Sequence, residues 1–377
     1  MRNFRKWNYM LLAGVLSLMA AVGLFNMFID PYGIWNSPAL ERVNAHKSEK
    51  YTHQRIFRAI DLERLKPQEI FLGSSRAFFG LDPKYYKILT GKTAYNLSLN
   101  AINTTEMLAY FKHAIYNQPD LQEVVIGLDF YAFNAYHEGR TDFSADRLNK
   151  RHITFDDTLN TLFSWDACQS SWDTLGYNLE HPDTPLVEEN GLLTDAGIKR
   201  HHVQSLSVQE TFDRELSTYL YSKQYFGSYQ LTMDNYRELI RLCQENNIKV
   251  IAYISPAHAT LWEAIKVAGL WPVFEEWKKE VSALTPVWDF SGYTEITTEP
   301  ISETIQNFWD STHYKKPVGN LVLERMFNPQ SDKVPADFGI LISPDNIEAH
   351  LAKTRQDQAA WEKKNPDVVS YVNRMKY

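Results

Sequence analysis

The stretch Glu69-Ile70-Phe71-Leu72-Gly73-Ser74-Ser75-Arg76 decides the predicted fold. Its apolar run ends abruptly in small residues, which indicates a buried strand that turns directly into a helix. A side chain at the carboxyl end of such a strand lies where open α/β sheets bind their ligands. The first N–H groups of the helix are free to bind an oxyanion. Ser75 is therefore a candidate nucleophile, and a serine that only caps the helix is the alternative.

A second polar stretch lies far downstream, at Phe308-Trp309-Asp310-Ser311-Thr312-His313-Tyr314. An aspartate three residues before a histidine allows the carboxylate to lie beside the imidazole and to orient it. A serine together with such a pair is the arrangement that nucleophilic acyl transfer needs. The alternative for Asp310 and His313 is a surface pair that caps the start of a helix.

These two stretches resemble the GDSL/SGNH hydrolase superfamily, whose first block is Gly-Asp-Ser and whose last block is Asp-x-x-His. The likeness extends in the order of elements from Ile70 to Phe327. It implies that Ser75 is the nucleophile, that His313 is the general base and that Asp310 holds the tautomer of His313. The likeness is greatest to membrane-anchored members that acylate bacterial cell-surface polymers, such as the alginate O-acetylation proteins and the D-alanyl transfer protein of teichoic acids.

The chain departs from the family in the blocks that form the oxyanion hole. Ser98 stands at the place of the second-block glycine, and Asp129 at the place of the third-block asparagine. An ionised Asp129 would repel an oxyanion, so binding to Arg76 or to a sugar hydroxyl is the other interpretation. Arg76, beside the nucleophile, is a candidate for charge stabilisation. Two further residues are candidate substrate contacts: Asn100, in the same loop as Ser98, and His258, which follows a later predicted strand. For His258 the plainer alternative is a loop histidine without a function.

The N-terminus predicts a membrane anchor. Arg2, Arg5 and Lys6 precede an uncharged run from Trp7 to Ile29, which is long enough to span a bilayer as a helix. The positive-inside rule places the N-terminus in the cytoplasm and the bulk of the chain outside. A cleaved signal peptide is the rival interpretation, but the apolar run exceeds a usual signal core.

Strand and helix patterns alternate through the rest of the chain, which predicts a parallel α/β fold. With the resemblance, this gives a three-layer flavodoxin-like sheet. We expect the anchor at 1–33, the α/β domain at 34–335 and a polar helical tail at 336–377. The alternation lapses at 131–231, so we expect a helical insertion there that borders the active-site edge. One long helix with an interruption at Pro272 is expected over 259–277.

The composition narrows the classes of function. The net charge is −7 and no basic patch is interleaved with aromatic residues, so nucleic acid is not an expected partner. Cys168 and Cys243 have no metal-binding spacing, so no metal or other cofactor is expected. A disulfide between them and two free thiols are both compatible with the sequence.

The expected function is serine-dependent acyl transfer, with acetyl implied by the resemblance, or ester hydrolysis on a cell-envelope or exported polysaccharide. The resemblance also implies a multi-spanning membrane O-acyltransferase as a partner. The alternative is a non-catalytic, membrane-tethered glycan-binding or assembly protein with the same fold. The departures at Ser98 and Asp129 favour this alternative, whereas Ser75, Asp310 and His313 together favour the enzyme.

Overall fold

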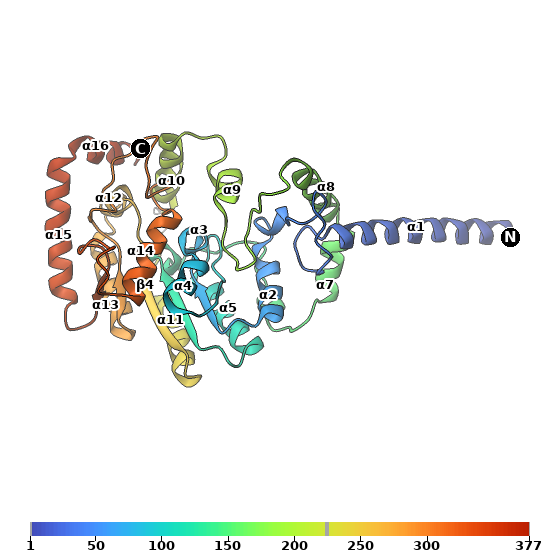
Figure 1. Cartoon of the computed structure of the whole chain (residues 1–377), viewed down its shortest axis with the longest axis horizontal. Helices are drawn as coiled ribbons and strands as arrows, with labels where there is room; N and C mark the ends of the chain where they lie inside the picture. Colours follow the sequence, from blue (N-terminus) through green and yellow to red (C-terminus); the bar gives the residue numbers. More distant parts are fainter. Residues whose placement is uncertain (1, 223–225, 377) are drawn as a thin grey trace.

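Six strands form one sheet at the centre of the molecule in the computed structural model of the chain (Figure 1). Their order is β2-β1-β3-β4-β5-β6; the first five are parallel, and β6 pairs with β5 in the antiparallel direction. The predicted α/β class and its mostly parallel sheet are thus confirmed. The strands are β1 (Glu69–Leu72), β2 (Ala94–Asn96), β3 (Glu123–Leu128), β4 (Lys249–Ile254), β5 (Val287–Asp289) and β6 (Ile340–Ile342).

The structure describes residues 2–222 and 226–376. Positions 1, 377 and 223–225, which fall in the expected anchor, tail and insertion, lie outside the described residues.

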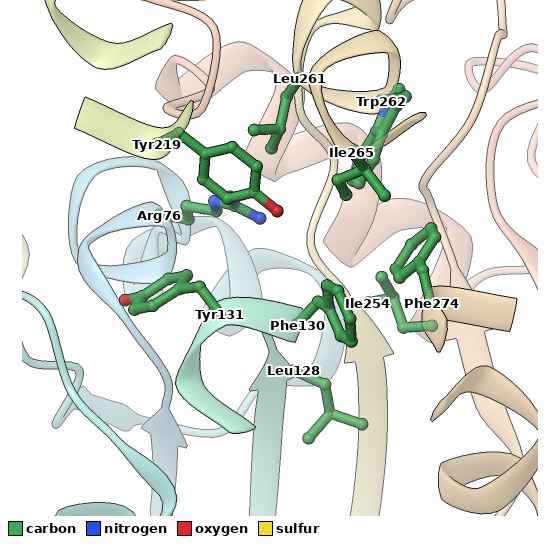
Figure 2. A pocket seen from close by; sticks show the side chains of 10 residues that line it. All are labelled: Arg76, Leu128, Phe130, Tyr131, Tyr219, Ile254, Leu261, Trp262, Ile265 and Phe274. Carbon is green, nitrogen blue, oxygen red and sulfur yellow. The ribbon is translucent and has the colours of Figure 1, made fainter. Parts of the chain in front are cut away.

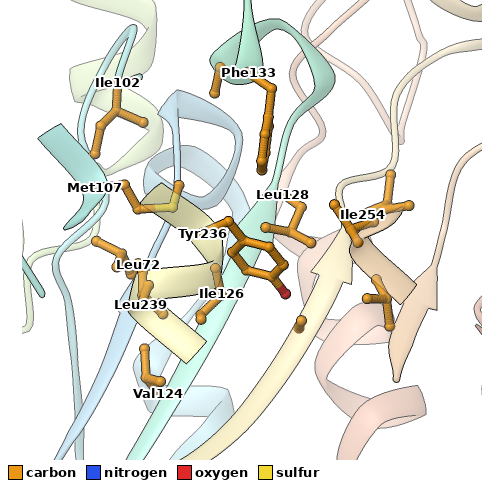
Figure 3. Close-up of a cluster of buried hydrophobic side chains, with 14 of the residues drawn as sticks. Leu72, Ile102, Met107, Val124, Ile126, Leu128, Phe133, Tyr236, Leu239 and Ile254 are labelled. Carbon is orange, nitrogen blue, oxygen red and sulfur yellow. The ribbon is translucent and has the colours of Figure 1, made fainter. Parts of the chain in front are cut away.

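Both faces of the sheet are apolar, as expected of buried parallel strands. Successive side chains of a strand point to opposite faces, so Ile70 and Leu72 belong to one core and Phe71 to the other. In Figure 3, Leu72, Val124 and Ile126 of the strands meet Met107 and Tyr236 of covering helices in the first core. The helices of this face are α2 (Gln54–Leu65), α5 (Thr104–Asn117), α11 (Gln230–Glu245), α12 (Ala259–Val267), α13 (Trp271–Leu284) and α15 (Ile347–Lys364).

The second core lies under a smaller set of helices. These are α3 (Ser75–Gly80), α4 (Pro83–Thr90) and α14 (Lys316–Phe327). The sheet is therefore covered on both faces, and the carboxyl ends of β1, β3, β4 and β5 open onto one edge. The register aligns Leu128 with Ile254 and Ile254 with Asp289 at that edge.

Helices of one to four turns fill the segment between β3 and α11, where the sequence predicted a helical insertion. They are η2 (Phe130–Phe133), α6 (Ala145–Leu148), α7 (Phe155–Thr158), η3 (Leu159–Phe163), α8 (Trp165–Glu180), α9 (Asp195–Ile198), η4 (Lys199–Val203) and α10 (Val208–Ser222). Figure 1 shows α7 and α8 beside the inner end of α1 (Arg2–Ile29), whereas α10 lies beside α12 and far from α1.

Helix α1 projects from the domain, and hydrogen bonds join its C-terminal end to the domain. Among the described residues it is the one helix long and apolar enough to cross a membrane. Asn44 Nδ2 donates to the carbonyl oxygen of Phe28 at 2.7 Å, and Lys47 Nζ donates to that of Ile29 at 3.0 Å. These bonds satisfy carbonyl groups that the end of a helix leaves open. Asp30, at φ 52°, then accepts from the N–H of Ile34 at 2.8 Å.

Two parts of the predicted chain order need correction. The single helix expected over 259–277 is two helices, because the chain turns at Gly269 in the left-handed region, with φ 73°. Pro272 lies in the first turn of α13, where proline is tolerated, and does not interrupt a helix. The expected helical tail at 336–377 begins with β6, which completes the sheet, and continues as α15 and α16 (Pro366–Arg374).

Candidate active site

Ser75 lies where β1 becomes α3. The side chain of Ser74 is the N-cap of this helix, since its Oγ accepts from the N–H of Arg76 at 3.2 Å. Ser74 therefore has the capping role that was the alternative for Ser75. The Oγ of Ser75 lies 2.8 Å from Nε2 of His313, which is 238 residues away in the chain. Both residues lie at the carboxyl edge of the parallel strands.

The loop before α14 holds His313 and Asp310 in a fixed relation. Nδ1 of His313 lies 2.8 Å from Oδ2 of Asp310, and Thr312 Oγ1 is also 2.8 Å from this nitrogen. Oδ1 of Asp310 accepts from the N–H groups of Thr312 and His313 at 2.6 and 2.9 Å. The ring of Phe79 in α3 stacks on the imidazole with the centroids 4.7 Å apart. The imidazole is thus fixed from two sides.

The charges of this pair follow from their surroundings. Burial opposes the ionisation of Asp310, but the imidazoles of His313 and His202 hold its pKa well below the usual range. Burial also opposes the protonation of His313, yet the carboxylate of Asp310 raises the pKa of this imidazole above 6.5. Asp310 is therefore ionised, and His313 is a stronger base than a free histidine.

A second histidine completes the group, and sequence reasoning missed it. His202 of η4 places Nε2 2.7 Å from Oδ2 of Asp310, the oxygen that also faces His313. An ionised carboxylate is only an acceptor, so Nε2 carries the proton. Arg214 of α10 fixes the turn by donating from Nη1 to the carbonyl oxygen of His202 at 2.8 Å. No motif spacing marks His202 in the sequence, so only the expected position of the insertion pointed towards it.

His202, Asp310 and His313 offer ligand atoms that lie within 4.8 Å of one another, as a metal site requires. Two observations favour hydrogen bonds over coordination in this arrangement. The separations of 2.7 and 2.8 Å are shorter than the about 3.3 Å between ligands of a tetrahedral zinc ion. In addition, the guanidinium group of Arg214 lies 3.4 Å from Nε2 of His202 and would repel a cation.

Arg76 and Asp129 form a buried ion pair beside the serine. Arg76 Nη1 lies 2.8 Å from Oδ1 of Asp129. Burial disfavours the charge on Arg76, but Asp129 and the weaker effects of the surrounding tyrosines and of Asp310 together raise the guanidinium pKa. Of the two expected roles of Asp129, the structure shows the contact with Arg76. Its Oδ2 has no hydrogen-bond partner among the described residues, so one buried acceptor remains for a water molecule or a substrate hydroxyl.

Aromatic and aliphatic side chains surround this ion pair. Figure 2 shows the Arg76 side chain between Tyr219 of α10 and Tyr131 of η2, at one side of a cavity. The cavity measures about 10 Å³, which is room for about one water molecule. Its other lining residues come from β3, η2, β4, α12 and α13 and are apolar. The environment of Arg76 is therefore largely apolar, which strengthens its attraction to Asp129.

The structure changes the interpretation of three expected oxyanion or substrate contacts, Ser98, His258 and Asn100. The backbone N–H of Ser98 donates to Asn96 Oδ1 at 3.1 Å, so it is already engaged and does not face an oxyanion. His258 caps α12 through Nδ1, and its Nε2 lies 2.7 Å from the carbonyl oxygen of Glu299, so both ring nitrogens are occupied. Burial lowers the pKa of His258 to about 4. This residue supports the site through its backbone N–H, which donates to Ser311 O at 3.1 Å.

Asn100 belongs to the scaffold below the site. Its N–H donates to Gln54 Oε1 at 2.8 Å, and its carbonyl oxygen accepts from Arg55 Nη2 at 3.0 Å. Its Oδ1 is buried without a hydrogen-bond partner among the residues that the structure describes. Cys168 and Cys243 are both free thiols, which leaves the disulfide alternative without support.

Comparison of the chain with protein-family models and with curated protein sequences finds no match.

Proposed function

We propose that this protein is a membrane-anchored serine acyltransferase or esterase that acts on a cell-envelope or exported polysaccharide. The observation that carries the proposal is the hydrogen-bonded series Ser75 Oγ, His313 and Asp310, with separations of 2.8 Å at both steps. A serine beside a base that a carboxylate orients is the arrangement of an activated nucleophile. The capping role of Ser74 leaves the hydroxyl of Ser75 for this chemistry.

The proposed reaction has two halves. Ser75 Oγ attacks the carbonyl carbon of the acyl donor and gives its proton to Nε2 of His313. The tetrahedral intermediate then breaks its bond to the donor oxygen, and His313 returns the proton to that leaving group. In the second half a sugar hydroxyl, or water in hydrolysis, loses its proton to His313 and attacks the ester on Ser75. The second intermediate then breaks its bond to Ser75 Oγ, and His313 returns the proton to that oxygen.

Asp310 stabilises the imidazolium that forms in each half, and His202 holds Asp310 in place. For the oxyanion, the backbone N–H of Ser75 at the start of α3 is our candidate donor. The N–H of Ser98 is not a candidate because it already donates to Asn96, and the ionised carboxylate of Asp129 is only an acceptor. Arg76 contributes positive charge beside the serine while Asp129 balances it.

The order β2-β1-β3-β4-β5 supports the proposed flavodoxin-like, SGNH-type fold, since this is the strand order of flavodoxin-like sheets. The polysaccharide substrate, the acetyl group and the multi-spanning O-acyltransferase partner rest on the resemblance of the two sequence blocks. Arg2, Arg5 and Lys6 in the first turns of α1, ahead of its apolar run, support a cytoplasmic N-terminus with the domain outside. Alkaline phosphatase fused after Tyr32 should therefore be active, and a stable, inactive fusion would contradict this topology.

A fluorophosphonate probe tests the serine mechanism, because it modifies only activated serines. The full-length chain in nanodiscs should gain one adduct, which intact-mass and peptide analysis locate at Ser75. Ser74→Ala is the matched control and should still react, whereas Ser75→Ala should not. A folded chain that acquires no adduct would favour the non-catalytic glycan-binding alternative.

A further inference from the structure

At residues 23–26, just before its last turn, α1 packs against the insertion. Asn26 Nδ2 donates to the carbonyl oxygen of Leu162 at 2.8 Å. Gly23 allows Phe163 to approach so closely that a methyl group at this position would lie 2.7 Å from Cε1 of the ring. The rings of Phe25 and Trp172 meet with their centroids 5.0 Å apart. Helices η3 and α8 therefore lie against α1 at the level of residues 23–26.

The helices that enclose α1 expose an apolar stripe each. Helical spacing of four and seven residues puts the members of each stripe on one face. Phe155 and Trp165 are 74% and 77% exposed, and Trp172 remains 63% exposed beside Phe25. We call these two stripes together the apolar collar; it consists of Phe155, Leu159 and Phe163 of α7–η3 and of Trp165, Trp172 and Leu179 of α8.

The collar residues lie on one face of each helix and are not dispersed over its surface. On α8 the acidic residues Asp166, Asp173 and Glu180 are exposed too, but they follow each collar member by one position. One residue adds about 100° of rotation, so the acidic and apolar stripes are separate. The opposite face of α8 is buried against residues 32–60, through contacts such as that of the Tyr32 hydroxyl with Ser170 Oγ at 3.1 Å. An exposed apolar surface of this kind marks an interaction site.

The length of α1 indicates what covers the collar. From Trp7 to Phe25 the helix rises by 18 steps of about 1.5 Å, or about 27 Å. This is close to the about 30 Å of the hydrocarbon core of a bilayer. If Trp7 lies at the inner interface, Phe25 and its neighbour Trp172 lie at the outer one. Tryptophan is enriched at both interfaces, where its ring is apolar and its N–H is hydrated.

We propose that the apolar collar rests in the interfacial layer of the outer leaflet and seats the insertion on the membrane around α1. The collar and α1 are continuous, and Figure 1 shows α7 and α8 on either side of the point where α1 leaves the domain. The inference rests on the proposed membrane location and is independent of the serine chemistry. The occupant is lipid, bound through buried apolar area and aromatic rings at the headgroup level.

Quenching of tryptophan fluorescence by brominated phosphatidylcholine tests the proposal on the full-length chain in nanodiscs. The chain has ten tryptophans. The fluorescence of a given tryptophan is therefore measured as the emission lost when it is replaced by phenylalanine, which keeps the surface apolar. We expect the emission lost in Trp165→Phe/Trp172→Phe to be at least halved by bromine. Bromine near the headgroup, at carbons 6 and 7, should quench it more than bromine at carbons 11 and 12.

Two further variants distinguish a failure of the collar proposal from a failure of the membrane anchor. Trp7→Phe reports on the anchor, and Trp361→Phe reports on a half-buried tryptophan of α15, at the end of the molecule remote from α1 (Figure 1). Emission from Trp361 should be insensitive to bromine. Quenching of Trp7 without quenching of Trp165 and Trp172 would overturn the collar and leave the anchor standing. Quenching of neither would overturn both.

A protein partner would give a different result. If the collar emission is unquenched in nanodiscs but shifts to shorter wavelength only after co-reconstitution of a multi-spanning membrane protein, the collar binds protein and the proposal is wrong. The readout needs no turnover, so Ser75→Ala should behave like the unsubstituted chain. Loss of the proposed enzyme activity and failure of the collar are therefore distinguishable.

Discussion

Gly319 of α14 lies directly against the backbone of Gly80 in α3, so that a methyl group at Gly319 would overlap the carbonyl oxygen of Gly80. These two helices adjoin the two halves of the proposed site: α3 begins with Ser75, and α14 follows His313. The glycine contact therefore sets the distance between nucleophile and base.

Gly319→Ala should force α3 and α14 apart. We expect a loss of about 2–3 kcal/mol in the free energy of unfolding, as for other overpacked cores, and a larger fractional loss of ester turnover. Denaturant unfolding and p-nitrophenyl acetate hydrolysis measure the two effects. Gly176→Ala in α8 is the control, because an added methyl group there meets no atom within 4 Å. Equal behaviour of the two variants would show that the helix spacing is adjustable.

Ser75→Ala and His313→Ala should each abolish turnover, and their effects should not add, because the two residues act as one unit. Kinetics of the two single variants and the double variant check this expectation. Ser74→Ala serves as the control and should keep measurable turnover, with a stability loss of about 1 kcal/mol from the missing cap. Turnover at the wild-type rate in purified Ser75→Ala would rule out the serine mechanism.

The acid limb of the pH–rate profile should lie above pH 6.5. His313 must be neutral to accept a proton, and Asp310 raises its pKa, so activity is absent at low pH and rises through that raised pKa. A limb below pH 6.5 would contradict the assignment of His313 as the base.

His202→Phe should shift the acid limb to higher pH. Loss of the donor leaves the charge of Asp310 less well stabilised, so it binds the imidazolium of His313 more strongly. His202→Gln, which retains an N–H donor, should restore the original limb. His201→Phe is the matched control, since His201 stacks on Tyr51 at 4.4 Å and does not take part in the hydrogen bonds to Asp310. A merely structural role of His202 would lower turnover without moving the limb.

Asp129→Asn should leave Arg76 buried without its counter-ion. We expect a loss of about 3 kcal/mol in stability, as for other broken buried pairs, together with lower turnover. Asp234→Asn, in an exposed pair with Arg237, should cost about 1 kcal/mol or less. Thermal unfolding and ester hydrolysis make the comparison. Turnover that stays level or rises in Asp129→Asn would mean that Asp129 opposes the oxyanion.

The sequence predicted the scaffold where local pattern and topology agree. Strand β1 follows from its apolar run, and the meeting of Ser75 with His313 follows from parallel strands that share one carboxyl edge. Strand β6 was missed because three residues, half exposed, carry too little pattern. His202 was missed because its position depends on how the whole insertion packs, which no local signal encodes. His258 was misassigned for a related reason: its capping geometry exists only once α12 and the loop at Glu299 are in place.

The capped end of α1 has a mechanical consequence. Asn44 and Lys47 bind the last carbonyl groups of the helix and Asp30 binds the chain that follows, so the junction contains no flexible linker. A tilt of α1 therefore moves the whole domain with it. Helices tilt when the bilayer is thinner than their apolar length. If α1 spans a bilayer as proposed, the local thickness of the membrane would set the height and the angle at which Ser75 meets the proposed polysaccharide substrate.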